Sequence, residues 1–307
     1  MFDFVAVGHF SIDRVLLPGN ELPLTILGGS VAYSLLTAKR FAVSVSVISK
    51  VGYDFLDEYV SYLEQESIDL SGMTTVNTAK TTSYELRYDD DMSHRKLRLL
   101  SKTPAITVED IPESLKAKII HITPIANEVS YTVIKKLRGR TPYLSIDPQG
   151  LVRTFNKSGI TTYHGVDRRL FRFFDIYKST LDEAKAITGL SDLASIIKGI
   201  HSLGVRMVII TLGVEGVLIS FNQTIHHIPS LEPKRVVDPT GAGDVFAGAF
   251  LAEYLSNFDP LWCGCVGSAA ASLSVETSGP NFFGSRLMIY QRARLLHGKE
   301  IKQLHLS

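Results

Sequence analysis

Short apolar segments alternate with helical patterns along most of this chain, and this alternation limits its fold more than any other feature of the sequence. Apolar runs of strand length lie at 4–7, 43–48, 119–122, 143–146, 173–177 and 207–211. Patterns of helical spacing lie at 32–41, 53–66, 244–255, 261–275 and 285–296. Continuous apolar strands joined by helices are typical of a parallel sheet that is buried on both faces. The sequence therefore predicts an α/β fold of three layers, in which helices cover both faces of a central, mainly parallel sheet.

Two segments interrupt this alternation. Residues 16–26 contain two prolines and a glycine and are predicted to be extended rather than helical. Residues 74–100 contain two stretches, 84–88 and 96–99, in which apolar and polar residues alternate. Such alternation predicts a hairpin with one face toward water, with its turn at Asp89–Asp91.

These interruptions indicate how the chain is organised. We expect segments of about 14–27 and 74–103 to pair as a small sheet over the mouth of the main sheet. They would then be inserted in one domain that spans residues 1–307. The alternative is two unrelated surface excursions.

Charge and composition exclude several classes of protein. The chain has 307 residues and a formal net charge of +1, so its overall charge does not favour nucleic acid or an anionic membrane as a partner. It has no stretch of about 18 apolar residues, and its first residues lack the basic and apolar regions of a signal peptide. Cys263 and Cys265 lie among apolar neighbours, which is typical of buried free thiols in a reducing compartment. We expect a cytoplasmic protein with no nucleic-acid or membrane partner.

The segment Val237–Asp244 carries the strongest chemical signal. Its small residues Gly241, Ala242 and Gly243 lie at the expected start of a helix. Backbone N–H groups at a helix N-terminus form a site for an anion, because they lack partners within the helix. A carboxylate beside an anion, at Asp244, is expected where a phosphoryl group is transferred and a general base removes the proton of the acceptor. The alternative is a glycine-rich helix start in which Asp244 is a favourable first-turn acid.

Two stretches of the chain resemble known signatures. Asp-Pro-Thr-Gly-Ala-Gly-Asp-Val-Phe-Ala-Gly-Ala-Phe at 238–250 resembles the second signature of the ribokinase-like (PfkB) family of carbohydrate and nucleoside kinases. Gly-Gly-Ser-Val-Ala-Tyr-Ser at 28–34 resembles the first signature, with Tyr33 in the place of the usual asparagine. The resemblance implies a ribokinase-like three-layer sandwich with a small β-sheet lid.

This resemblance also implies an ATP-dependent kinase. The γ-phosphoryl group of ATP would pass to a hydroxyl of a sugar, a nucleoside or a polyol, of which myo-inositol is one candidate, with Mg²⁺ as cofactor. Asp244 would be the general base, and Gly241, Ala242 and Gly243 would stabilise the transferred group. An exposed apolar face of the lid would provide the interface of a homodimer.

For the acceptor, the resemblance implies contacts from Asp13, Gly28, Gly29, Tyr33, Asp147 and Gln149. A carboxylate such as Asp13 suits this role because it accepts hydrogen bonds from two hydroxyls at once; the alternative is a turn residue. The segment 147–153 resembles the branch that contains myo-inositol kinases, and Arg153 is either a phosphate contact or a surface residue. Asp54 is predicted to be a helix N-cap, and His9 to be structural.

For the nucleotide, the resemblance implies contacts from Thr211, Gly213, Gly216, Thr240 and Ser268. Glu183 matches the glutamate by which the family organises water around Mg²⁺, although Thr180 replaces the asparagine of that motif. The same two residues predict a capping box with Thr180 as the N-cap, and the two interpretations are compatible.

Two other classes of function remain as alternatives. A non-catalytic sugar- or nucleotide-binding regulator on the same fold would have little need of Asp244. A dinucleotide-dependent oxidoreductase would need a Gly-x-Gly-x-x-Gly turn after its first strand, and the sequence has none there. It also lacks a Gly-x-x-x-x-Gly-Lys-Ser/Thr loop, which disfavours a P-loop kinase.

Overall fold

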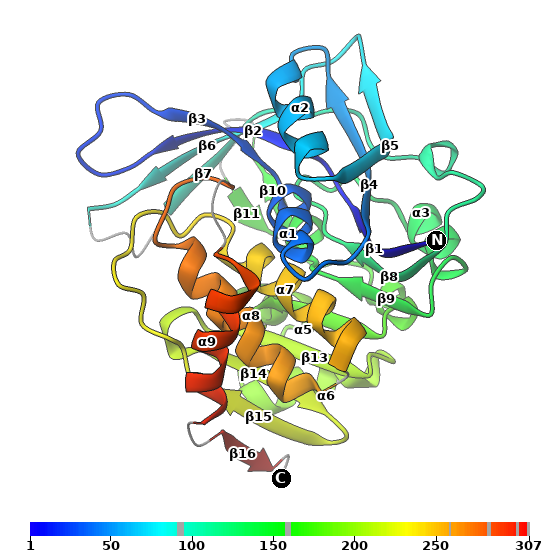
Figure 1. The fold of residues 1–307 in the computed structure, drawn as a ribbon. Coiled ribbons are helices and arrows are strands. Elements are labelled where there is room, and N and C mark those ends of the chain that lie inside the picture. Colours follow the sequence, from blue (N-terminus) through cyan, green and yellow to red (C-terminus); the bar gives the residue numbers. More distant parts are fainter. Residues whose placement is uncertain (91–94, 157–160, 258, 281–283, 299–300, 306–307) are drawn as a thin grey trace.

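A large twisted sheet forms the centre of the molecule (Figure 1). The computed structural model describes residues 1–90, 95–156, 161–257, 259–280, 284–298 and 301–305. In this part of the chain, ten strands follow one another in the order β16-β15-β14-β13-β12-β9-β8-β1-β4-β5. Their bounds are β1 Phe2–Val7, β4 Val45–Gly52, β5 Ile68–Val76, β8 Ala117–Ile122, β9 Tyr143–Ile146, β12 Ile176–Thr180, β13 Met207–Thr211, β14 Val217–Phe221, β15 Thr224–Ile228 and β16 Lys302–His305.

Neighbouring strands of this sheet are parallel from β13 to β5 and antiparallel from β13 to β16, so the predicted mainly parallel sheet is confirmed. Successive side chains of a strand enter opposite layers of the core. In β1, Phe4 and Ala6 face one apolar cluster, and Val5 and Val7 face the other. This two-sided burial explains why the strands read as continuous apolar runs.

Helices cover both faces of the sheet, which confirms the predicted three layers (Figure 1). One layer contains α1 Ser30–Lys39, α2 Asp57–Gln65, α7 Ala242–Asn257, α8 Pro260–Ser274 and α9 Arg286–His297. The other contains α3 Tyr131–Arg138, α4 Gln149–Val152, α5 Leu181–Thr188 and α6 Leu193–Ser202. Within the described residues, no helix has the length and apolar character that crossing a bilayer requires.

A separate four-stranded sheet, in the order β3-β2-β6-β7, lies at one end of the large sheet (Figure 1). Its strands are β2 Ser11–Leu16, β3 Leu24–Gly28, β6 Thr82–Tyr88 and β7 Arg95–Ser101. Antiparallel pairs join β2 to β3 and β6 to β7, and a parallel pair joins β2 to β6. The predicted pairing of the two inserted segments and the predicted hairpin are therefore confirmed. Of the predicted turn, Asp91 lies outside the described residues.

The apolar face of the small sheet packs against the chain's own residues. Val15, Tyr84 and Leu86 form a buried cluster with Ile125 and Ala126. Much of the face that the sequence analysis assigned to a homodimer is therefore covered within one chain, and the homodimer stays a prediction.

Two elements begin later than predicted, and one predicted cap is absent. The strand predicted at 173–177 begins at Ile176, because a 3₁₀ helix, Arg168–Phe173, starts at the Asp167 cap and precedes it. The helix predicted from Tyr53 begins at Asp57. The N-cap prediction for Asp54 is wrong, because its carboxylate accepts a 2.6 Å hydrogen bond from Thr81 N instead.

The two cysteines are buried in α8 as free thiols, as predicted. Burial raises the pKa of both, that of Cys265 to about 12. Reactive thiols need a stabilised thiolate, so these two are structural.

Candidate active site

The glycine turn that precedes α7 is held by the side chain of Asp238 and by residues that follow α8. Asp238 accepts hydrogen bonds from Thr240 N and from the Ser278 hydroxyl, both at 2.9 Å, and Val237 N donates to Val275 O at 2.7 Å. Gly241 has φ 76°, and a Cβ there would lie 2.4 Å from Cδ1 of Tyr33. Only glycine satisfies both conditions, so the close approach of α1 and this turn depends on Gly241.

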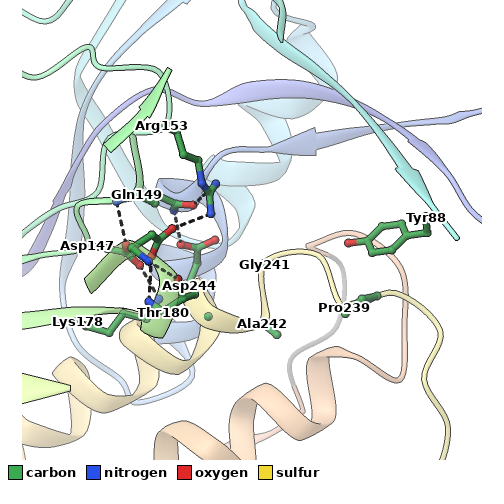
Figure 2. A pocket seen from close by; sticks show the side chains of 12 residues that line it. Tyr88, Asp147, Gln149, Arg153, Lys178, Thr180, Pro239, Gly241, Ala242 and Asp244 are labelled. Atoms are coloured by element: carbon green, nitrogen blue, oxygen red, sulfur yellow. Dashed lines mark hydrogen bonds and ion pairs between the residues drawn. The ribbon is translucent and has the colours of Figure 1, made fainter. Parts of the chain in front are cut away.

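Asp244 lies in the first turn of α7 and points toward Gln149 (Figure 2). The Ser30 hydroxyl also forms a hydrogen bond with its carboxylate. Gln149 Nε2 donates a 3.2 Å hydrogen bond to Asp244 Oδ1. Burial, and then the nearby Asp147 carboxylate, raise the pKa of Asp244 from 3.8 to about 6, while Lys178, Ser30 and Arg153 oppose the shift. A carboxylate with a pKa near 6 is mostly charged at neutral pH, and it is more basic than an ordinary aspartate.

Lys178, in the middle of β12, forms a buried ion pair with Asp147 (Figure 2). The distance from Nζ to Asp147 Oδ2 is 2.5 Å, and a Cβ at Gly243 would lie 2.9 Å from the same Nζ. The ammonium group is thus next to the glycine turn. Lys178 is not among the predicted site residues, because the strand was predicted to end at residue 177 and a lysine inside a buried strand was therefore not recognised.

Arg153 is a site residue and not a surface residue. Its side chain is 15% exposed. Nη1 donates to Gln149 Oε1 at 2.7 Å, and Nη2 donates to Glu183 Oε1 at 2.8 Å (Figure 2). The predicted capping box is confirmed, because Thr180 Oγ1 accepts from Glu183 N and Glu183 Oε2 accepts from Thr180 N.

Two adjoining cavities lie around Asp244. The larger, of about 250 Å³, is lined by Tyr88, Asp147, Gln149, Arg153, Lys178, Thr180, Glu183, Pro239, Gly241, Ala242, Gly243 and Asp244. The smaller, of about 60 Å³, is lined by Ser11, Asp13, Gly29, Ser30, Tyr33, Tyr84, Leu86, Leu97, Ile125, Gln149, Arg153, Thr240, Gly241 and Asp244. Four residues line both cavities, and Asp244 is one of them. Asp244 therefore borders two spaces of different composition.

Most of the residues predicted to bind the acceptor are brought together at the smaller cavity. Asp13 and Tyr33 are buried there. Gly28 lies behind Asp13, because a Cβ on Gly28 would be 2.1 Å from Asp13 Oδ2. Asp147 lines the larger cavity instead. His9 is buried, with ring nitrogens 2.9 Å from Thr82 Oγ1 and 3.2 Å from Pro104 O, as a structural histidine should be.

The residues predicted to bind the nucleotide are not all together. Thr240 lines the smaller cavity. The remaining four line neither cavity: Thr211, Gly213, Gly216 and Ser268. Three further residues line the cavities without having been predicted, one from α1 and two from the small sheet: Ser30, Tyr84 and Tyr88.

Comparison with known proteins decides the class of enzyme. A family model described as the pfkB family carbohydrate kinase matches residues 4–285. The chain belongs to this family. A cytidine kinase of Thermococcus kodakarensis is 31% identical over 257 residues, which cover 83% of this chain and 89% of that protein. An inositol 3-kinase of Arabidopsis thaliana is 25% identical over 307 residues, which cover 98% of this chain and 81% of that protein.

Solved structures agree about the fold. A pyrophosphate-dependent kinase of the ribokinase family, solved with sulfate, has a TM-score of 0.80 and 23% sequence identity. The match covers 94% of this chain and 99% of that protein. The predicted ribokinase-like fold is confirmed. This pfkB-family member is a kinase of the sugar and nucleoside kinase class, which transfers a phosphoryl group to a hydroxyl.

Proposed function

We propose that this kinase transfers the γ-phosphoryl group of ATP to a hydroxyl of a small ring-shaped acceptor, with Asp244 as the general base. One observation carries the proposal: Asp244 lines both cavities. The larger cavity contains the glycine turn and Lys178, which suit phosphate, and the smaller contains Asp13, which suits hydroxyl groups. A base between them contacts the acceptor hydroxyl where the phosphoryl group arrives.

In this mechanism the acceptor oxygen forms a bond to the γ-phosphorus as the bond from that phosphorus to the β,γ-bridging oxygen breaks. The hydroxyl proton passes to an oxygen of Asp244, and ADP leaves. The N–H groups of Gly241 and Gly243 stabilise the charge on the transferred group. Ala242 contributes less, because Ala242 N already donates a 3.3 Å hydrogen bond to Pro239 O. Each such donor is typically worth about 3–4 kcal/mol in the transition state.

Mg²⁺ would neutralise charge on the phosphates of the bound nucleotide. Both oxygens of Glu183 have partners, Arg153 and Thr180 N, and the side chain is 1% exposed. Within the described residues, no group of three His, Cys, Asp or Glu side chains is arranged to hold a metal ion. The residues therefore fit an ion that is held mainly by phosphate oxygens and water, with Glu183 in the outer shell.

The acceptor is proposed to carry neighbouring hydroxyls on a ring. The relatives include a cytidine kinase and an inositol kinase, and the ribose of cytidine and the inositol ring share this feature. Asp13 accepts two such hydroxyls at once, which supports either acceptor.

The test is release of ADP from ATP and Mg²⁺ with cytidine, other nucleosides, myo-inositol, ribose and fructose, in the wild-type protein and in Asp244→Asn. Asp192→Asn, at the exposed N-cap of α6, is the matched control for the chemical change. We expect turnover with one acceptor class, lost by about 10²-fold or more in Asp244→Asn and retained in the control. Turnover in Asp244→Asn equal to that of the wild type would overturn the assignment of Asp244 as the general base. Turnover with pyrophosphate but not with ATP would overturn the assignment of ATP as the phosphoryl donor.

A further inference from the structure

Arg153 and Gln149 lie between the two cavities, and the proposed mechanism gives neither of them a role. Arg153 donates to both Glu183 Oε1 and Gln149 Oε1, at 2.8 and 2.7 Å. Gln149 Nε2 in turn donates to Asp244 Oδ1 at 3.2 Å and to Ser30 Oγ at 2.5 Å. A continuous path of hydrogen bonds therefore leads from Glu183 through Arg153 and Gln149 to Asp244 (Figure 2).

We propose that Arg153 is a positioning residue, which holds the Gln149 amide so that its N–H group faces the base Asp244. A guanidinium has N–H donors and no acceptor, whereas an amide has one donor end and one acceptor end. Contact with Arg153 therefore requires Oε1 on the side of Arg153 and leaves Nε2 on the side of Asp244. The reversed amide would place two donors together at Arg153 and two acceptors together at Asp244, and both contacts would be repulsive.

The anchor of Arg153 is itself fixed. Glu183 is buried, and its second carboxylate oxygen accepts from Thr180 N in the capping box of α5. Arg153 is thus held at two nitrogens, between a rigid helix start and Gln149. A planar guanidinium held at two points loses its rotational freedom, which makes it a good support for another side chain.

The expected consequence is a change in the acidity of Asp244. The groups that shift its pKa are Lys178 from β12, Asp147 after β9, the Ser30 hydroxyl from α1 and Arg153 after α4. The Tyr33 hydroxyl from α1 also faces it, and Asp244 helps to raise the pKa of that hydroxyl. A donated N–H favours the charged carboxylate and lowers its pKa. Without the Gln149 N–H, the pKa of Asp244 should rise, and the acidic limb of the activity profile should move to higher pH.

This inference rests on the proposed function, and it is testable without substrate. The full-length protein is labelled with ¹³C at aspartate carboxyl carbons, and the Asp244 signal is identified by its absence in Asp244→Asn. The titration midpoint is then measured in Gln149→Leu, Gln149→Glu, Arg153→Met and the Gln149→Leu/Arg153→Met double variant. Arg292→Met is the matched control, because Arg292 is also 15% exposed and also bonds a carboxylate and a neutral oxygen.

We expect Gln149→Leu to raise the midpoint by about one pH unit, a tenfold change in proton affinity. Gln149→Glu, which keeps the volume and the contact with Arg153, should raise it further, because two carboxylates then face each other. Arg153→Met should raise the midpoint more in the wild-type background than in Gln149→Leu, where its only remaining effect is its charge. The Arg292→Met control should leave the midpoint unchanged.

Equal shifts from Arg153→Met in both backgrounds would overturn the proposal, because Arg153 would then act by charge alone. An unchanged midpoint in Gln149→Glu would also overturn the proposal, because it would mean that Nε2 of Gln149 does not face Asp244. If Arg153→Met does not fold, Gln149→Glu alone tests the proposal. These failures differ from failure of the proposed function. Full turnover in Asp244→Asn would overturn the assignment of Asp244 as the base. If Asp244→Asn is inactive but the Asp244 midpoint is unchanged in the Gln149 and Arg153 variants, only the positioning role of Arg153 is overturned.

Discussion

Tyr88 of the small sheet and Thr240 of the glycine turn are joined by a 2.8 Å hydrogen bond between their side-chain oxygens. The two residues are 152 positions apart in the sequence. Tyr88 lines the larger cavity and Thr240 lines the smaller one. The bond therefore connects the sheet over the site to the turn that begins α7.

Tyr88→Phe removes the hydrogen bond to Thr240 and keeps the aromatic ring that lines the larger cavity. We expect a loss of about 1 kcal/mol in the free energy of unfolding, measured in urea, together with a several-fold rise in KM. Tyr62→Phe is the control, because Tyr62 OH donates at 2.8 Å to Pro280 O, and neither residue lines either cavity. It should lose similar stability with KM unchanged. A rise in KM of the same size in both variants would show that the Tyr88 bond has no special effect on the site.

Gly28→Ala should displace the Asp13 carboxylate. The new Cβ would lie 2.1 Å from Asp13 Oδ2, well inside contact distance. If Asp13 holds the acceptor, KM for the acceptor rises by about tenfold or more, while binding of ATP, measured by calorimetry, stays unchanged. Gly165→Ala is the control, since nothing lies within 4 Å of its Cβ. Unchanged KM in Gly28→Ala would argue against Asp13 as an acceptor contact.

Lys178→Met should destabilise the protein strongly, because it leaves the Asp147 carboxylate buried without its partner. Losing one member of a buried pair typically costs about 3–5 kcal/mol. Arg169→Met removes an exposed ion pair with Asp167 and should cost far less, because solvent screens the two charges. Urea unfolding of both variants checks this difference. An equal loss in the free energy of unfolding in both variants would mean that the buried ion pair stabilises the protein no more than the exposed one does.

Asp244→Asn should stabilise the protein in a pH-dependent way. The folded pKa of about 6 lies above the usual 3.8, so the charged form is disfavoured by folding. This cost is absent below about pH 4 and is complete above about pH 6, where it amounts to about 1–3 kcal/mol. Asparagine never carries the charge, so Tm of Asp244→Asn should exceed that of the wild type at pH 8 and approach it at pH 4.5. A Tm difference that does not change with pH would contradict the raised pKa of Asp244.

Local patterns determined much of this protein. The strands at 143–146 and 207–211 were predicted with their observed bounds, because a strand buried on both faces consists mostly of apolar residues. The capping box of Thr180 and Glu183 was predicted from a spacing of three residues. The small residues before Asp244 likewise marked the start of α7, since the turn needs Gly241 at positive φ.

Tertiary structure alone decided which distant side chains meet. Lys178 contacts Asp147, 31 positions away, and Arg153 contacts Glu183, 30 positions away. No local sequence pattern predicts either contact. Asp54 was predicted to cap a helix, but its carboxylate accepts a hydrogen bond from Thr81 N, 27 positions away. The capping propensity of a residue describes only its interactions with residues close to it in the sequence. The acidity of Asp244 depends on burial and on the nearby charges of Lys178 and Asp147. The orientation of Gln149 depends on its contacts with Arg153 and Ser30. These surroundings exist only in the folded chain.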